Sequence, residues 1–194
     1  EFATLDKLVF PYFETKRLNP RDSKLLVLND YFGLDYGFIN DPSAFMHIKL
    51  DMKNKTLYVM DEFVKKGLLN NQLAQVIKDM GYSKEVITAD SAEKKSIAEM
   101  KRDGIYRIRP ALKGPDSIIQ GIQFLQQFKW VVDDRCVKTI EELQNYTYVK
   151  DKKTDEYTNR PIDAYNHCID AIRYAVEEEN GHGSTKARII KSFI

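Results

Sequence analysis

Three aspartates stand in apolar surroundings at widely separated points of the sequence. Asp35 lies in the run YFGLDYGF, Asp90 ends the short run EVITAD, and Asp170 lies within NHCIDAIRYA. Carboxylates are rarely buried without a partner, because moving a charge out of water is costly. A shared divalent cation would give all three the same partner, since carboxylate oxygens are preferred ligands of Mg²⁺ and Mn²⁺. The sequence therefore predicts a metal site built from three acids.

A histidine near Asp170 extends this predicted site. In a helix over residues 161–180, Asp163, His167 and Asp170 stand at i, i+4 and i+7 and share one face. We interpret His167 as a fourth ligand or as a residue that orients a water near the metal, the alternative being a structural histidine. Asp163 is a weaker candidate, because the first turn of a helix favours an acid through the helix dipole.

Two of the acids also have structural interpretations. Asp41, in NDPS, is typical of a turn, and we assign it to one. Asp90 is equally suited to cap the helix that follows it, for which Ser91 is a further candidate N-cap.

Alternation, turn residues and helical spacing predict the elements that must position these side chains. The predicted strands are 24–38, 44–52, 56–64, 85–90, 105–112 and, shorter, 130–134. The predicted helices are 68–82, 91–104, 115–128, 139–144 and 161–180, with a projecting hairpin over 146–160. Short turns join the first three strands, so we expect them to be antiparallel. The order predicts one mixed sheet between helices.

Composition indicates an ordinary globular protein. The 194 residues are 43% hydrophobic and 30% charged, and no apolar run is long enough to span a membrane. The start has no signal-peptide pattern and is abrupt, which suggests an excised domain. The two cysteines have no metal-type spacing and are expected to be reduced thiols. A net charge of +1 means that nucleic-acid binding would depend on local patches.

Residues from about 25 to 180 resemble the nuclease domain of the large terminase subunit of tailed bacteriophages, which has a ribonuclease H-like fold. The resemblance rests on GLDYG followed by DPSAF, on ITAD, and on NHCIDAIRYA. Its most specific part is His167, two spacers, Asp170 and then Ala-Ile-Arg-Tyr. Asn166 departs from the pattern, because relatives often carry an acid before the histidine.

The resemblance implies an α/β fold with a central mixed five-stranded sheet, helices on both faces and a protruding β-hairpin. Asp35 would lie on the middle strand beside the strand that carries Asp90, and the last helix would deliver Asp170. With His167, these acids would be catalytic and would bind two Mg²⁺ or Mn²⁺ ions. Residues 25–180 would form the nuclease domain, 1–24 a lead-in segment and 181–194 a loosely held basic tail.

The implied activity is hydrolysis of phosphodiester bonds in concatemeric viral DNA during genome packaging. The implied partners are double-stranded DNA, the ATPase domain of a longer protein, the small terminase subunit and the portal protein. The site of action would be the cytoplasm of an infected bacterium, with no place in the mature virion and no membrane. We expect a monomer without an ATP site, since GHGSTK lacks the spacing of a phosphate-binding loop.

Basic residues in two segments are candidates for contacts with DNA phosphates. They are Arg107, Arg109, Lys113, Lys150, Lys152, Lys153 and Arg160. By charge alone, the hairpin residues are equally well explained as a solvated tip. Little base readout is expected, because no recognition helix or aromatic stacking platform is evident.

Two alternatives remain open. One is a junction resolvase or an RNA–DNA hybrid nuclease of the same fold. The other is a non-catalytic DNA-docking module of the packaging motor, whose acids bind only a structural metal. Gly33 and Gly37 would leave room beside the backbone near Asp35, although strand irregularity explains them equally well.

Overall fold

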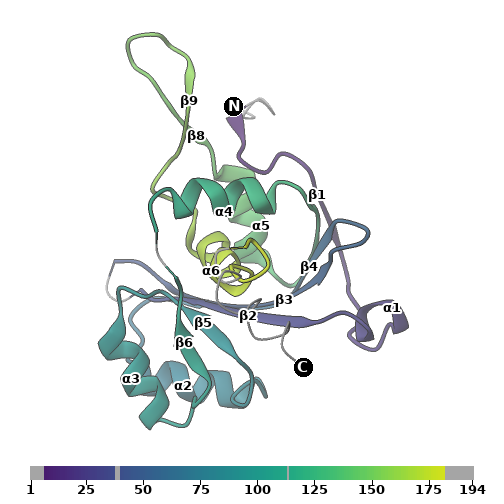
Figure 1. Cartoon of the computed structure of the whole chain (residues 1–194), viewed down its shortest axis with the longest axis vertical. Coiled ribbons are helices and arrows are strands. Elements are labelled where there is room, and N and C mark those ends of the chain that lie inside the picture. The colour runs from purple at the N-terminus through teal and green to yellow at the C-terminus, as the bar shows by residue number, and fades with distance from the viewer. Residues whose placement is uncertain (1–6, 38–39, 113, 182–194) are drawn as a thin grey trace, which may run out of the picture.

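The computed structural model describes residues 7–37, 40–112 and 114–181. A seven-stranded mixed sheet carries helices on both faces, and a separate two-stranded hairpin projects from it (Figure 1). The strands of the large sheet are β1 (Phe13–Lys16), β2 (Asp30–Asp35), β3 (Ser43–Asp51), β4 (Thr56–Lys65), β5 (Ile87–Ala89), β6 (Ile108–Pro110) and β7 (Lys129–Asp133). The hairpin strands are β8 (Tyr148–Lys150) and β9 (Tyr157–Pro161). The helices are α1 (Ser23–Leu26), α2 (Asn70–Asp79), α3 (Lys94–Arg102), α4 (Ser117–Leu125), α5 (Val137–Asn145) and α6 (His167–Ala175).

The sheet has the order β1-β7-β4-β3-β2-β5-β6. Strands β2, β3 and β4 are antiparallel as predicted, and β5 and β6 add in parallel beside β2. The predicted five strands are therefore β4-β3-β2-β5-β6, with β2 in the middle. The count of five is wrong, because β7 pairs with β4 and β1 pairs with β7, both in parallel. Residues 13–16 of the expected lead-in segment thus belong to the sheet.

Two predicted elements have different boundaries. The first predicted strand begins as helix α1, because the Asp22 carboxylate caps it by accepting the backbone N–H of Lys24 at 2.9 Å. The last predicted helix begins only at His167, since Pro161 still belongs to β9 and Tyr165 has φ +56°. Asp163 therefore does not share a helical face with His167.

The N-cap of α3 is also different from the prediction. Glu93 occupies the N-cap position, not Ser91 or Asp90. The Asp90 carboxylate instead accepts the backbone N–H of Ala92 at 2.9 Å, two residues further on. This bond closes a local turn directly after β5 and holds the side chain at the end of that strand.

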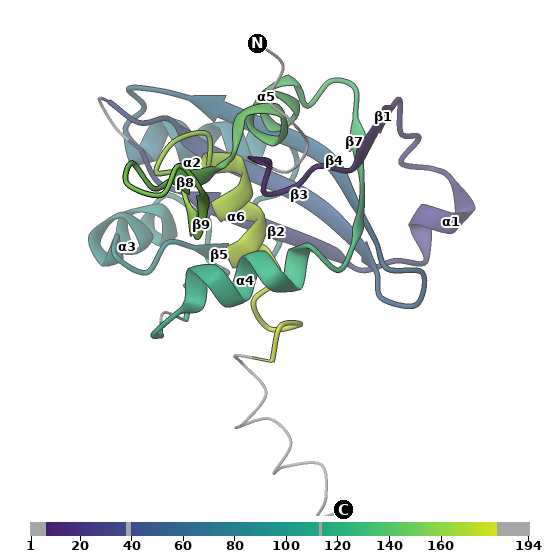
Figure 2. The same cartoon turned by 90° about the horizontal axis from the view of Figure 1, so that it is seen from above.

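Helices cover the sheet from both sides, as predicted. Helices α4, α5 and α6 pack on one face and α2 and α3 on the other (Figures 1 and 2). Strand β3 is consequently buried from Ser43 to Leu50, although its sequence alternates. No helix in the described ranges has both the length and the apolar character that a membrane span requires.

Helix α6 crosses the sheet in close contact with β2 at Gly33. A Cβ atom at Gly33 would lie 1.7 Å from the carbonyl oxygen of Ala171, a distance that no side chain can adopt. Gly33 therefore leaves room beside the backbone, which is one of the two interpretations that the sequence left open, and it lets α6 approach β2 directly beneath Asp35 and Asp170.

Replacing Gly33 by Ala is expected to force α6 away from β2. Overpacking of this kind costs about 1–3 kcal/mol of unfolding free energy, which urea denaturation measures. Gly114→Ala is the matched control, because a Cβ at Gly114 meets no atom within 4 Å. Equal stability of the two variants would contradict a close contact between α6 and β2.

Candidate metal and catalytic site

The four residues predicted to form the metal site come from neighbouring elements. Asp35 is the last residue of β2, and Asp90 directly follows β5. These strands are parallel neighbours, and the backbone N–H of Asp90 donates to the carbonyl of Leu34 at 3.0 Å. Helix α6 packs across both strands and carries His167 and Asp170 in its first turn. The structure thus brings all four side chains to the carboxyl ends of β2 and β5.

Asp35 is buried, with 9% of its surface exposed, and contacts His167. The His167 Nδ1 atom lies 3.1 Å from Asp35 Oδ2, where a ring N–H donates to the carboxylate. The pKa of Asp35 is raised to about 6, chiefly by burial and also by the negative charges of Asp170 and Asp90, while His167 acts in the opposite direction. The hydrogen bond to Asp35 in turn raises the pKa of His167. His167 Nε2 faces Asp41 at 3.8 Å, so this turn residue lies at the edge of the site.

Asp170 has a basic partner on its own helix. The Arg173 Nη2 and Nε atoms donate to Asp170 Oδ1 at 3.1 and 3.2 Å. Burial raises the pKa of Asp170 and the charge of Asp90 adds to the rise, although Arg173 opposes it. A Cβ at Gly121 would lie 2.4 Å from Arg173 Cδ, so this glycine of α4 leaves space for the arginine. The i, i+3 spacing could have indicated this pair.

A second buried aspartate shows what an ordinary buried ion pair looks like in this protein. Asp133 is fully buried and accepts two hydrogen bonds from the Arg135 guanidinium and one from the backbone N–H of Leu18. Although burial acts to raise it, these bonds lower the pKa of Asp133 to about 2. Among the described residues, Asp35 pairs with His167 and with no arginine, and two acids lie nearby, so its charge is less well compensated than that of Asp133.

The chemistry of these donors fits a divalent cation. Among the described residues, no group of three or more His, Cys, Asp or Glu side chains is already arranged to hold a metal ion. However, Asp35 is buried and Asp170 is partly buried, with 18% of its side chain exposed, and each has a pKa raised in part by neighbouring carboxylates. A cation would relieve this repulsion, and oxygen ligands with one imidazole suit Mg²⁺ or Mn²⁺.

Glu142, which the sequence did not indicate, anchors the start of α6. It is 7% exposed, and its carboxylate oxygens accept the backbone N–H groups of Cys168 at 3.0 Å and Ile169 at 3.1 Å. Burial raises the pKa of Glu142 to about 7, against the effect of these two donors. Because Cys168 and Ile169 lie between His167 and Asp170, this carboxylate fixes the turn that presents both residues to the site.

A second carboxylate anchors α5 in the same way. Glu62 of β4 accepts the backbone N–H groups of Lys138 and Thr139 at 2.8 Å each, and the Thr139 hydroxyl at 2.7 Å. The start of α5 is thus attached to the sheet through Glu62, and the start of α6 to α5 through Glu142. Glu62 and Glu142 are thus two anchoring carboxylates, which connect the sheet to α5 and α5 to α6.

The candidate DNA contacts are distributed over two regions. Arg107 is exposed and donates from Nη1 to the carbonyl of Lys84 at 3.1 Å, and Arg109 pairs with Glu178 at 2.6 Å. Lys113 lies outside the described residues.

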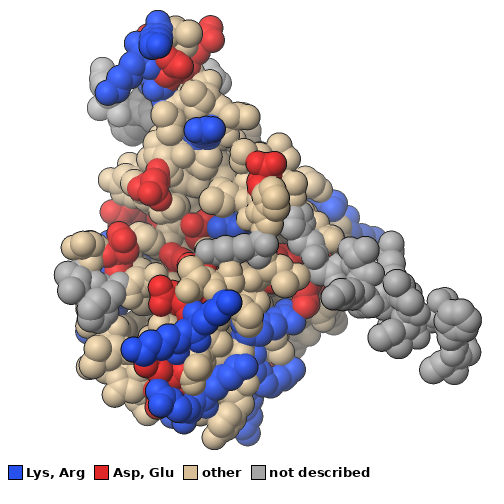
Figure 3. Space-filling model, turned by 60° about the vertical axis from the view of Figure 1, so that its left-hand side comes forward, with Lys and Arg blue, Asp and Glu red and all other residues tan. Residues whose placement is uncertain are grey.

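In the hairpin, Lys150 pairs with Asp155, whereas Lys152, Lys153 and Arg160 are exposed. Figure 3 shows basic and acidic side chains intermixed at this tip and a separate group of basic side chains over the lower part of the face.

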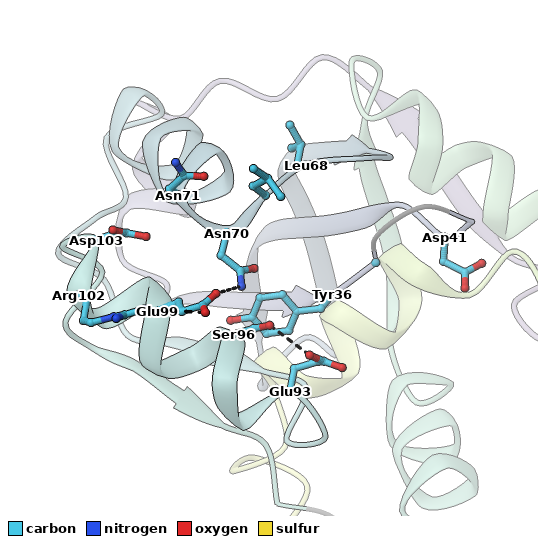
Figure 4. A pocket seen from close by; sticks show the side chains of 12 residues that line it. Tyr36, Asp41, Leu68, Asn70, Asn71, Glu93, Ser96, Glu99, Arg102 and Asp103 are labelled. Atoms are coloured by element: carbon cyan, nitrogen blue, oxygen red, sulfur yellow. Dashed lines mark hydrogen bonds and ion pairs between the residues drawn. The ribbon is translucent and has the colours of Figure 1, made fainter.

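A cavity of about 690 Å³ lies between α2, α3 and the end of β2 (Figure 4). It begins at Tyr36, next to Asp35, but four acids (Asp41, Glu93, Glu99 and Asp103) line its wall against one arginine, Arg102. Within the described ranges, the Tyr36 hydroxyl is buried without a hydrogen-bond partner. The acids make this cavity a poor path for a polyanion, so a DNA strand that reaches Asp35 is expected to approach from another side.

Comparison with known proteins identifies similar sequences. Residues 35–178 match a family model described as the Terminase RNase H-like domain. The large terminase subunit of Bacillus phage SPP1 is 36% identical over 154 residues, which cover 78% of this chain and 36% of that protein. The PBSX phage terminase large subunit of Bacillus subtilis is 31% identical over 175 residues, covering 88% of this chain and 38% of that protein. The chain thus spans well under half the length of these relatives.

Solved structures show the same fold. The nuclease domain of the SPP1 large terminase, solved with bound Mn, superposes with a TM-score of 0.80 at 32% identity, covering 89% of this chain and 99% of that one. The P22 large terminase nuclease domain gives a TM-score of 0.64 at 13% identity, covering 91% and 92%. The expectation of an α/β ribonuclease H-like fold is therefore confirmed.

Proposed function

The chain belongs to the terminase RNase H-like domain family, and on this premise we propose that it is a metal-dependent DNA endonuclease. Its reaction would be hydrolysis of phosphodiester bonds in concatemeric viral DNA during genome packaging. One observation carries the proposal: Asp35, Asp90, Asp170 and His167 meet at the ends of two parallel strands, where burial and mutual repulsion raise the pKa values of Asp35 and Asp170. Such a cluster suits a divalent cation.

In this proposal, the four residues hold Mg²⁺ or Mn²⁺. Two bound ions would activate the attacking water and stabilise the leaving 3′ oxygen. The protein's own contribution is to fix the ligands: His167 orients Asp35 at 3.1 Å, and Arg173 orients Asp170. The SPP1 nuclease domain with bound Mn supports divalent metal use at an equivalent fold.

The wider context is proposed from the relatives. Because the large terminase subunits are longer than this chain, residues 25–180 would act as the nuclease domain beside an ATPase domain in one protein. The further partners would be double-stranded DNA, the small terminase subunit and the portal protein, in the cytoplasm of the infected host. The chain by itself would be monomeric.

Nicking of supercoiled plasmid tests the proposal. We expect open-circular and linear products with Mn²⁺ or Mg²⁺ and none with EDTA. Absence of cleavage with either ion at high enzyme excess would leave only the non-catalytic docking role. Linear duplex, a four-way junction and an RNA–DNA hybrid are compared in the same assay, because preference for the junction or the hybrid would favour the alternative nuclease activities.

A further inference from the structure

A cavity of about 440 Å³ opens directly beside His167. Its wall includes Lys65 and Lys66 from the end of β4, Lys138 from the start of α5, and Tyr165 from the loop before α6. Lys65 is paired in register with Ser43, so the end of β4 lies against the β2–β3 turn. Because His167 also lines the cavity, one end of it reaches the candidate metal site. This lysine cavity is the space lined by Lys65, Lys66, Lys138, Tyr165 and His167.

Two of its lysines keep an uncompensated charge. Lys65 and Lys66 are exposed, and no carboxylate of the described residues lies within ion-pair distance of either. Lys138 is different, because it pairs with Glu141 at 2.8 Å.

The remaining acids of the lysine cavity face other groups. The Glu142 carboxylate accepts the backbone N–H groups of Cys168 and Ile169. Asp41 is directed towards His167 at 3.8 Å. An anion in the cavity would therefore meet the two free ammonium groups of Lys65 and Lys66.

Tyr165 adds an exposed aromatic surface to the same wall. The residue is 44% exposed, and its backbone has φ +56°, a left-handed conformation that bulky residues rarely adopt. Strained backbone of this kind tends to occur at functional sites, where the surrounding structure holds it in place. Here, it holds an aromatic ring two residues before His167.

We propose that the lysine cavity binds the sugar–phosphate backbone of the DNA strand next to the scissile bond. Lys65 and Lys66 contact phosphates, and Tyr165 packs against a sugar or a base. Lysine–phosphate contacts position nucleic acid without reading its sequence, and a stacked aromatic ring accepts any base. The inference rests on the proposed nuclease function, and it assigns the approach of the substrate to this side of His167.

The double substitution Lys65→Ala and Lys66→Ala tests the inference. A fluorescent duplex is titrated in EDTA, which prevents cleavage, over a range of KCl concentrations. Losing two phosphate contacts should reduce the slope of log affinity against log salt by about 2. The matched control is Lys53→Ala with Lys55→Ala, which removes the same charge at the opposite end of β3 and β4. Equal slopes for the two double variants would overturn the inference.

Tyr165→Asn provides the second variant, because asparagine tolerates a positive φ. Loss of the stacked ring is expected to weaken binding about tenfold. Unchanged affinity would remove Tyr165 from the proposed site.

These outcomes are separable from failure of the proposed function. Suppose that the unmodified chain does not nick plasmid, but the double variant at Lys65 and Lys66 has a smaller slope of log affinity against log salt. The lysine cavity then binds DNA in a docking module. If the unmodified chain nicks plasmid and the slope does not change in the double variant, the nuclease function holds and the assignment of DNA binding to the lysine cavity is wrong.

Discussion

Asp35→Asn is expected to abolish DNA cleavage, lowering the rate by about 10³-fold or more, while the fold persists. Of Asp35, Asp90 and Asp170, Asp35 has the least exposed surface, and among these three it is the one that contacts His167. An amide cannot replace an anionic ligand, and loss of several kcal/mol of metal-based stabilisation corresponds to about three powers of ten in rate. The measurement is the single-turnover rate on plasmid with saturating Mn²⁺.

The fold should survive this change, because asparagine has nearly the same shape and can still bond to His167. It also removes a negative charge that Asp90 and Asp170 repel. The melting temperature in EDTA is therefore expected not to fall. Asp30→Asn is the control on the same strand: Asp30 pairs with Lys49 at 2.7 Å, away from the site, and its loss should leave cleavage by the folded protein unchanged. Wild-type cleavage by the Asp35 variant would refute the assignment.

Glu142→Gln is expected to weaken both stability and metal binding, although Glu142 is not itself a predicted ligand. The amide can accept only one of the two backbone N–H groups at the start of α6, and its own N–H₂ group faces the other. Loss of one hydrogen bond to a charged acceptor costs about 2 kcal/mol of unfolding free energy. Mutation of residues that hold metal ligands in position typically weakens metal affinity about 10- to 100-fold. Urea denaturation and Mn²⁺ titration of cleavage measure the two effects.

Glu141→Gln is the matched control one residue away on the same helix. Its side chain is 49% exposed and pairs only with Lys138 among the described residues, so both stability and the Mn²⁺ requirement should remain near those of the unmodified protein. If Glu141→Gln and Glu142→Gln have the same stability and the same Mn²⁺ requirement, the Glu142 carboxylate does not position α6. Conversely, a loss of stability in Glu142→Gln with an unchanged Mn²⁺ requirement would restrict Glu142 to a purely structural role.

The positions of the three acids of the candidate site could be predicted from the sequence because each one is locally anomalous. Asp35 and Asp170 interrupt apolar runs, and Asp90 ends one, so their positions at strand ends and on a buried helix followed from periodicity. The three antiparallel strands and the hairpin followed from short polar turns in the same way.

The supporting contacts could not be predicted, because they join residues far apart in the chain. Glu62 and Thr139 are separated by 77 positions, and nothing in the local sequence of either indicates the other. The same holds for β1 and β7, whose parallel pairing extends the sheet beyond five strands. Strand pairing at such separation depends on the packing of the whole chain, whereas local propensity reports only neighbouring residues.

The segment before α6 was mispredicted for a related reason. Pro161 is favoured at the start of a helix, and the apolar residues that follow it have helical spacing. In the structure, Pro161 closes the hairpin instead, and Tyr165 turns the chain with φ +56°. Tertiary contacts thus override a strong local signal at the point where an aromatic ring is placed on the wall of the lysine cavity.

A crystal of this chain soaked in Mn²⁺ tests the central claim most directly. Anomalous difference density identifies manganese without reference to activity. The account predicts a peak within ligand distance of Asp35, Asp90 and Asp170, with a second ion when DNA is bound. Manganese at other positions only, or no peak at millimolar Mn²⁺, would contradict a metal site formed by these carboxylates.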